Sequence, residues 1–341
     1  MLSRLKKATF SSVAALAALL AAPTYAQSTN LEAAFDQALG TELRVPQTYD
    51  AIYDSSFERR IAQLADGDRG RIGVAAIDLA TGEEVAILGD QLFPMASTSK
   101  IAIAATYLEL VEKGKYSLTS EFPLMIPVSS ARFSSSKAPV RKGEYMQAID
   151  LIEIMITRSS NPATDALLAA VGGPDKVNDW VRRQGIKEFS IDRDIATLVR
   201  DDGEFDPAYY IDKRDAATPR AMVELLRGFY QGKYLSADSR RVLLGAMSRT
   251  RTGKRRIVAN MPSDARVSHK TGSLNNTSSD IGIIEAPDGR AIAVAIYVTG
   301  QGSRLERENR IASIARALYD GFASRARTRG PVWTSADHNG G

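Results

Sequence analysis

The sequence predicts an α+β fold, in which an antiparallel sheet of about five strands is flanked by N- and C-terminal helices and joined to a helical lobe. Strand-like segments occur in two separate stretches, at about 60–115 and 255–325, and a mainly helical pattern fills 116–254 between them. The chain has 341 residues, of which 44% are hydrophobic, and this is ordinary for a globular protein of two lobes. The two strand-rich stretches must therefore pair in one sheet.

The first strand-rich stretch follows a polar, helical segment at 27–69. The string RIGVAAIDLATGEEVAIL, at 71–88, is typical of a hairpin whose Thr-Gly turn lies at 81–82. Apolar residues then recur at helical spacing over 101–111, and Gly114 follows them. We therefore expect an N-terminal helix, two strands and a buried helix in this order.

Capped helices and then further strands are predicted along the rest of the chain. Several helical segments open on Asp, Asn or Pro and close on Gly, as in NPATDALLAAVGG at 161–173. Strand patterns return at 265–272, 280–286 and 291–298, and a last helix at 304–323 carries one apolar stripe. We expect the ligand in the cleft between the sheet and the helical lobe.

The first 26 residues are typical of a secretory signal peptide. Three basic residues precede an apolar run at 13–22, and a Thr-Tyr-Ala string ends the segment. We expect cleavage after Ala26, a folded domain at 27–329, a flexible tail at 330–341, and a periplasmic or secreted protein. The apolar run is too short to span a bilayer, so we expect no membrane anchor after cleavage.

The charge balance argues against a nucleic-acid partner. The sequence has 44 basic and 40 acidic residues, and the first 26 residues hold three basic and no acidic ones, which leaves 41 against 40, or +1. A near-neutral chain without a basic block does not offer the electrostatic surface that nucleic acids need. We expect a monomer whose partner is a small-molecule substrate.

Cysteine and histidine are too scarce for several kinds of site. The chain has no cysteine and only two histidines, His269 and His338, the second of which lies in the polar tail. A single usable histidine disfavours the common three-ligand zinc centre, and a Ser-His-Asp triad would depend on His269 alone. We therefore expect no metal and no cofactor, with a lysine or a carboxylate transferring the protons.

The string FPMASTSK places Ser97 and Lys100 three residues apart, where a loop becomes a helix. The two side chains project from the same side, and a desolvated lysine amine can accept the serine proton. The alternative is that Ser97 only caps the helix. The same spacing recurs at Ser134 and Lys137 without a helix opening, so the surroundings of each string must decide.

Two further strings provide chemically compatible groups. ITRSSN contains Ser159, whose hydroxyl can relay a proton to a leaving nitrogen, and Asn161, whose amide can orient a substrate amide. VSHKTGS lies on a predicted strand, where Lys270 and Thr271 can hold a substrate carboxylate and the strand edge can donate to an oxyanion. Each string alone is common, but three in this order, the last on a strand, are not.

On these residues the chain resembles the class A serine β-lactamases over about 60–325. The resemblance implies a serine hydrolase that opens the β-lactam amide, with Ser97 as nucleophile, Lys100 as its activator and Ser159 as proton relay. In some members an arginine 14 residues before the strand lysine binds the substrate carboxylate, and Arg256 has this spacing, with surface charge as the alternative. The implied substrate-binding residues are Asn161, Arg256, Lys270, Thr271, Gly272 and Ser273.

The string RDDGEFDPAYYIDKRD resembles the Ω-shaped loop of this family, in which a glutamate activates the deacylating water. The resemblance makes Arg200 and Asp215 the structural clamp of the loop and places the catalytic base at Asp202. An aspartate is one methylene shorter than a glutamate, so the backbone shifts, or Glu204 takes over, or deacylation is slow. Ser160, where the family usually has Asp, removes a buried charge that braces the loop.

Two alternatives to β-lactam hydrolysis remain open. A D-alanyl-D-alanine peptidase or esterase shares the acylation step and needs no loop base of this type. A sensor domain is acylated by β-lactams and deacylates slowly, although such sensors are normally attached to a membrane segment. The full-length loop favours the β-lactamase, and Asp202 in place of glutamate keeps both alternatives open. We interpret His269 as a packing or hydrogen-bonding residue.

Overall fold

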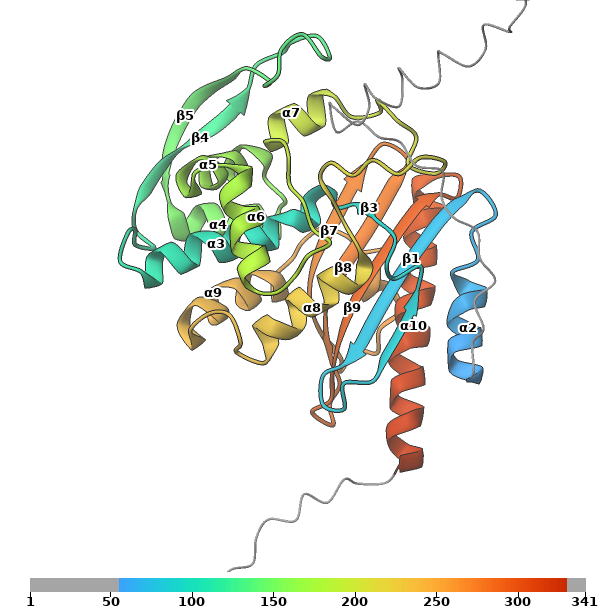
Figure 1. The fold of residues 1–341 in the computed structure, drawn as a ribbon. Coiled ribbons are helices and arrows are strands. Elements are labelled where there is room, and N and C mark those ends of the chain that lie inside the picture. Colours follow the sequence, from blue (N-terminus) through green and yellow to red (C-terminus); the bar gives the residue numbers. More distant parts are fainter. Residues whose placement is uncertain (1–54, 330–341) are drawn as a thin grey trace, which may run out of the picture. The chain divides into compact units, whose positions relative to one another are not determined.

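The computed structural model describes residues 55–329, and side chains as far as 325. Its centre is a five-stranded antiparallel sheet in the order β2–β1–β9–β8–β7 (Figure 1). β1 and β9 pair from Gly70 opposite Gly300 to Asp78 opposite Ile292, so the two strand-rich stretches share one sheet, as predicted. The strands are β1 (Gly70–Asp78), β2 (Glu84–Ile87), β7 (Arg266–Leu274), β8 (Thr277–Glu285) and β9 (Ala291–Gly300).

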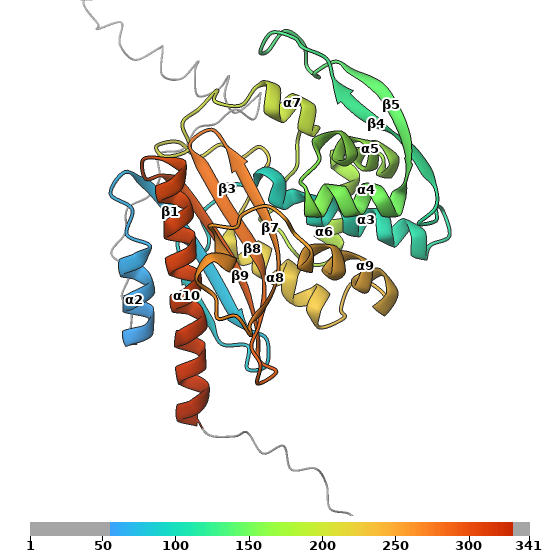
Figure 2. The same ribbon diagram turned by 180° about the vertical axis from the view of Figure 1, so that it is seen from behind.

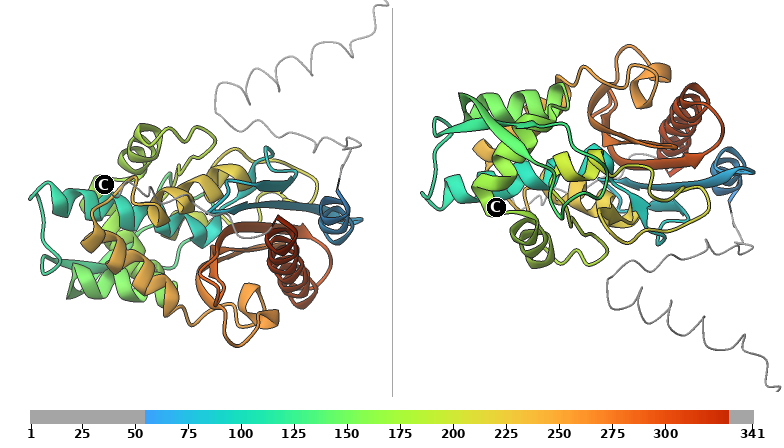
Figure 3. Two further views of the ribbon diagram at one scale, coloured as in Figure 1. Left: turned by 90° about the horizontal axis from the view of Figure 1, so that it is seen from below. Right: turned by 90° about the horizontal axis from the view of Figure 1, so that it is seen from above.

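Both faces of the sheet are buried, which explains the nearly continuous apolar runs of its central strands. Along β1, Val74 and Ala76 pack into one core, whereas Ala75 and Ile77 pack into a second core with the helical lobe. Figure 2 shows the helices of the first core on one side of the sheet, and Figure 3 shows the helical lobe on the other. The helices of the first core are α2 (Ser56–Leu64) and α10 (Arg304–Arg329).

The helical lobe is built around α3 (Lys100–Glu112), in which every residue from Lys100 to Leu108 is buried. A helix that is buried on all sides has no solvent face, so its first turn is held from every direction. The other helices of this region are α4 (Ala148–Thr157), α5 (Asn161–Val171), α6 (Pro174–Arg183), α8 (Pro219–Tyr230) and α9 (Ala237–Ser248).

A β-hairpin on the helical lobe was not predicted. β4 (Glu121–Pro127) pairs with β5 (Val140–Gln147), and β4 packs on α5. The strands are half-exposed and a register shift between Pro123 and Met125 interrupts their alternation, so the pattern that marks a strand is lost. The smaller elements are α7 (Ile195–Arg200), the strand pair β3 (Phe93–Pro94) and β6 (Ala216–Ala217), and the 3₁₀ turns η1 (Ala96–Ser99) and η2 (Ile257–Asn260).

The predicted boundaries of the buried helix agree with the structure. The helix predicted at 101–111 spans Lys100–Glu112, and Gly114 follows it with a left-handed φ of 72°. The predicted signal peptide and the tail at 330–341 lie outside the described residues. None of the helices in the described part of the chain is both long enough and apolar enough to cross a membrane.

Candidate active site

Ser97 lies on η1, directly before α3, and does not cap that helix. The N-cap position of α3 is Ser99, and neither η1 nor α3 has a side-chain cap. The neighbouring hydroxyls are engaged, because Thr98 donates to Met95 O and Ser99 donates to Ala96 O, both at 2.8 Å. The capping interpretation of Ser97 is therefore wrong, and its half-buried hydroxyl remains available for chemistry.

Strand β7 approaches the turn of Ser97 very closely at Gly272. A methyl group at Gly272 would lie 2.7 Å from Met95 O and 3.1 Å from Ala96 Cβ, and it would also meet Ser279 Oγ. Contacts this short do not occur around real side chains, so only glycine lets the strand lie against the turn. Gly272 thus positions β7 beside the candidate nucleophile.

Lys100 is fully buried, and its amine faces the start of α5. Nζ donates to Asn161 Oδ1 at 2.7 Å, to Ser159 O at 2.8 Å and to Ser159 Oγ at 3.2 Å. Burial lowers the pKa of Lys100 well below its ordinary value, nearby Lys270 lowers it further, and Asp165 opposes both effects. An amine that loses its proton readily is suited to accept one from a serine.

Ser159 connects the two lysines of the site. Its Oγ accepts from Lys270 Nζ at 3.0 Å as well as from Lys100 Nζ, and its backbone is left-handed with φ 58°. Burial lowers the pKa of Lys270 to about 7, with Asp280 opposing this shift and Arg256 adding to it. A hydroxyl between two amines whose pKa values are both lowered by burial can pass a proton in either direction.

Four of the residues predicted to bind substrate lie on β7, which is an edge strand of the sheet, at 270–273. Lys270 and Thr271 are buried, whereas Ser273 is exposed at the end of the strand. Thr271 Oγ1 lies 2.7 Å from Thr252 Oγ1 on the preceding loop, which fixes its hydroxyl. Because β7 pairs only with β8, its free edge can hydrogen-bond an extended substrate.

Arg256 is buried behind β7 and does not face the cleft with free donors. Nη1 donates to Gly272 O and Ser279 O, both at 2.7 Å, and Nη2 donates to Ser273 Oγ at 2.7 Å. Glu308 Oε1 takes the remaining bonds, from Nε at 3.3 Å and from Nη2 at 3.1 Å. The prediction of direct carboxylate binding by Arg256 is not supported by this geometry, which instead orients Ser273.

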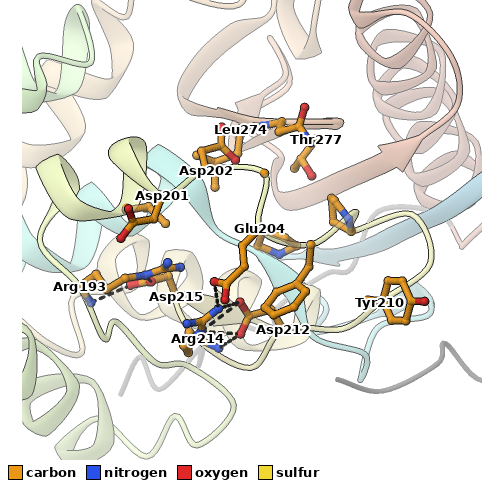
Figure 4. A pocket seen from close by; sticks show the side chains of 16 residues that line it. Arg193, Asp201, Asp202, Glu204, Tyr210, Asp212, Arg214, Asp215, Leu274 and Thr277 are labelled. Carbon is orange, nitrogen blue, oxygen red and sulfur yellow. Dashed lines mark hydrogen bonds and ion pairs between the residues drawn. The ribbon is translucent and has the colours of Figure 1, made fainter. Parts of the chain in front are cut away.

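The predicted clamp of the loop is wrong in one partner. Asp215 is buried and pairs with Arg193, whose Nε lies 2.6 Å from Asp215 Oδ2, as Figure 4 shows. Arg200 instead pairs with Asp201, Nε to Oδ1 at 2.7 Å, and binds Ser135. The loop length of the resembled family selects Arg200, but the arginine that pairs with Asp215 lies before α7 (Ile195–Arg200).

Asp202 contacts the turn between β7 and β8. Its Oδ2 accepts from Asn275 N at 2.8 Å, and Figure 4 shows its side chain beside Leu274. Burial raises its pKa, and the bond from Asn275 opposes this shift. Glu204 pairs with Arg214, Oε2 to Nη2 at 2.7 Å. Asp202 as deacylation base stays a prediction, and its contacts favour an anchoring role.

The carboxylate that acts on Lys100 is Asp165, which was not singled out from the sequence. It lies on α5, one turn beyond Asn161, and is 6% exposed. Its oxygens accept from Ile195 N at 2.7 Å and from Ala196 N at 2.9 Å. The spacing of four residues from Asn161 was the available signal, because it places both side chains on one helix face.

The remaining polar groups near the site have structural contacts. Ser160 Oγ accepts from Ala163 N at 3.4 Å and so caps α5. His269 is buried, with Nδ1 2.9 Å from Asp280 Oδ1, which agrees with the predicted hydrogen-bonding role. Over the described residues, no group of three or more histidines and carboxylates is arranged to hold a metal ion.

Comparisons with known proteins agree with this arrangement. The profile of the "Beta-lactamase enzyme family" matches residues 56–322. The chain is 32% identical to beta-lactamase CTX-M-8 of Citrobacter amalonaticus over 270 residues, which cover 78% of this chain and 89% of that protein. It is 29% identical to the extended-spectrum beta-lactamase PER-1 of Pseudomonas aeruginosa over 276 residues, 77% of this chain and 86% of that protein.

Solved structures show the same relationship. A variant of the class A beta-lactamase of the last common ancestor of Gram-negative bacteria superposes with a TM-score of 0.68 at 32% identity, over 80% of this chain and 100% of that one. A beta-lactamase from Chitinophaga pinensis superposes with a TM-score of 0.69 at 27% identity, over 79% and 100%. The chain belongs to the class A serine β-lactamase family.

Proposed function

We propose that this protein is a serine β-lactamase that hydrolyses the β-lactam amide through an acyl-Ser97 intermediate. The observation that carries the proposal is the chain of hydrogen bonds from Lys100 through Ser159 to Lys270. Ser97 lies one turn before Lys100, and its hydroxyl does not cap a helix. The similarity to enzymes named as β-lactamases supports the substrate class.

Acylation begins at Ser97. The neutral amine of Lys100 accepts the Oγ proton while Oγ bonds to the lactam carbonyl carbon, and backbone N–H groups at the edge of β7 stabilise the oxyanion. The carbon–nitrogen bond then breaks. The leaving nitrogen takes a proton from Ser159 Oγ, which regains one from the Lys100 ammonium 3.2 Å away. The products are a ring-opened acyl ester and a neutral Lys100.

Substrate orientation falls to β7 and α5. The ammonium of Lys270 and the hydroxyls of Thr271 and Ser273 attract the substrate carboxylate, and Arg256 acts by fixing Ser273 Oγ at 2.7 Å. Asn161, already bonded to Lys100 at 2.7 Å through Oδ1, has its amide N–H groups left to orient the substrate amide.

Deacylation needs a water and a base, and this half of the cycle separates the candidate functions. Asp202 accepts from Asn275 N, and Glu204 pairs with Arg214. Both loop carboxylates therefore already have partners other than a deacylating water. This favours slow deacylation and keeps a second candidate function, a D-alanyl-D-alanine peptidase or an acylated sensor that shares the acylation step.

We further propose that the protein is a monomer, and that it is exported to the periplasm or secreted after cleavage of the signal peptide following Ala26.

Steady-state hydrolysis of a penicillin and a cephalosporin by the purified protein tests the proposal. We expect turnover that Ser97→Ala abolishes. The matched control is Ser134→Ala, which removes an exposed serine of the same spacing whose Oγ donates to Ala131 O at 2.7 Å. Equal loss in both variants, or turnover that survives Ser97→Ala, overturns the role of Ser97. Cleavage of a D-alanyl peptide without lactam turnover selects the second candidate.

A further inference from the structure

Two buried charged groups, Lys270 and Asp165, act on Lys100. The mechanism above uses Lys270 and gives no role to Asp165. Lys270 reaches Lys100 through their shared partner, Ser159 Oγ. On the other side, Lys100 Nζ is bonded to Asn161 Oδ1, and Asp165 stands one turn further along α5. Residues four apart on a helix have Cβ atoms about 5–6 Å apart, so the Asp165 carboxylate lies on the same face of α5 as the Asn161 amide that binds the Lys100 amine.

The orientation of Asp165 is fixed by the backbone of a neighbouring element. Each of its oxygens accepts one N–H at the first turn of α7, from Ile195 and from Ala196. An asparagine has one acceptor oxygen, so it can keep both bonds only by sharing that oxygen between the two N–H groups. A carboxylate suits this site because each of its two oxygens has a backbone N–H partner of its own.

We propose that Asp165 is a positioning residue of the active site, which counterbalances Lys270 across the Lys100 amine and anchors the first turn of α7 beside it. The proposal rests on the proposed acyl-serine function. Asp165 does not touch the reacting atoms. It acts through Lys100, by its charge, and through α7, by its two hydrogen bonds.

The electrostatics of the pair have a definite sign. Burial raises the pKa of Asp165 to about 6, while the N–H groups of α7 and the charge of Lys100 oppose this shift and nearby Asp194 adds to it. At pH values above about 6 Asp165 is therefore ionised, and its charge favours the protonated form of Lys100. Loss of that charge lets Lys100 release its proton at lower pH.

The charged groups around Asp165 come from three elements. Lys100 belongs to α3, Asp194 precedes α7 as its cap, and Lys270 on β7 acts beyond Lys100. Asp194 provides the matched control, because it is also an acidic group at the start of α7, where its Oδ1 accepts from Thr197 N at 2.7 Å, but its charge is not among those that shift the pKa of Lys100. The two aspartates thus separate an effect on Lys100 from an effect on the loop alone.

The test is an NMR titration of the Lys100 side chain in protein labelled at lysine, with Lys100→Ala to assign the signal. We expect Asp165→Asn to lower the titration midpoint of Lys100 by about one pH unit, the low end of the range for the loss of a nearby opposite charge. Asp194→Asn should leave that midpoint within about 0.3 unit, because the charge of Asp194 is not among those that shift the pKa of Lys100. An unchanged midpoint in Asp165→Asn overturns the electrostatic part of the proposal.

Two further readouts complete the test. Hydrogen exchange of the Ile195 and Ala196 amides should accelerate at least tenfold in Asp165→Asn, and unchanged exchange overturns the anchoring part. If Asp165→Asn does not fold, Asp165→Glu keeps the charge and should keep the Lys100 midpoint near that of the unmodified protein, and a shift as large as that expected for Asn overturns the proposal. The titration needs no substrate, so it gives a result even if β-lactam turnover is absent.

If the protein is acylated by a penicillin, the pH dependence of acylation gives an independent check. The acid limb of that profile reports the deprotonation of Lys100 in the free enzyme. We expect the limb to move to lower pH in Asp165→Asn by the same amount as the NMR midpoint. A uniform loss of rate with an unmoved limb means that Asp165 is only structural.

Discussion

The acylation groups and the loop at 193–215 differ in what their charged side chains contact. Lys100 and Lys270 both donate to Ser159 Oγ, so the two amines share a partner within the site. The acidic side chains of the loop bond instead to arginines and to the turn after β7. The acylation half is thus arranged for proton transfer, whereas the loop carboxylates hold the loop in place.

The difference has a physical origin in burial. The two lysines are excluded from water, so their amines give up protons at lower pH than usual and become useful for catalysis. In the loop, the hydrogen bond from Arg200 lowers the pKa of Asp201 and so favours its ionised form, whereas burial raises the pKa of Asp215 against the opposing charge of Arg193. A paired carboxylate is a good anchor and a weak base. The following predictions test this contrast, beginning with the largest effect.

Lys100→Ala should lower the rate of acylation by about 10²- to 10⁴-fold, the range expected for loss of a general base. The measurement is the rate of adduct formation on Ser97 by mass spectrometry with a penicillin. Lys137→Ala is the control, because this exposed lysine ends the other Ser-x-x-Lys string of the folded domain. A loss of less than tenfold would mean that another group accepts the serine proton.

Arg193→Ala should lower the free energy of unfolding by about 3 kcal/mol, because it leaves the buried carboxylate of Asp215 without its ion pair. Chemical denaturation of single and double variants measures this effect. The coupling between Arg193 and Asp215 should be about 1–3 kcal/mol, and that between Arg200 and Asp215 within about 0.5 kcal/mol of zero. The reverse order would restore Arg200 as the clamp.

Gly272→Ala should cost about 1–3 kcal/mol of stability, the usual range for overpacking, and should slow acylation by moving β7 from the Ser97 turn. The cause is the contact of the new methyl group with Met95 O, 2.7 Å away. Gly245→Ala, on helix α9, is the control: its methyl group would meet only the flexible end of Arg249. Unchanged acylation in Gly272→Ala would show that β7 need not approach so closely.

Asp202→Asn should have the smallest effect, because the amide oxygen can still accept from Asn275 N. We expect an unchanged acylation rate and a deacylation rate lowered by less than about tenfold, below the usual contribution of a general base. Single-turnover mass spectrometry separates the two steps. A hundredfold slower deacylation would identify Asp202 as the base and remove the contrast between the two halves.

The fold could be predicted where local pattern and tertiary environment agree. Strands such as β9 are apolar on both faces, and α3 begins where its helical spacing begins, so periodicity alone identifies them. The β4–β5 hairpin has no such signal, because its exposed strands and bulge break the alternation. Its stability comes from packing on α5, which a single sequence does not show.

The same limit applies to the site. Ser97 and Lys100 lie on one turn, so their proximity follows from local spacing. The partner of Asp215 is set by the path of the loop, and spacing alone does not distinguish Arg193 from Arg200. Asp165 looks like an ordinary helix residue until α7 is folded against it, with Ile195 N donating to its carboxylate. The spacing of Arg256 from Lys270 likewise did not reveal that Arg256 is buried, with its donors bonded to Gly272 O, Ser279 O and Glu308.

An intact-mass time course of the protein with a penicillin tests most directly whether the Ser97 half acylates and the loop half releases the product. We expect one adduct, located on Ser97, that forms faster than substrate is hydrolysed in the steady state and clears when the penicillin is consumed. Such accumulation means that acylation is fast and deacylation limits turnover. Rapid hydrolysis without any adduct on Ser97, or an adduct on another residue, would contradict this mechanism.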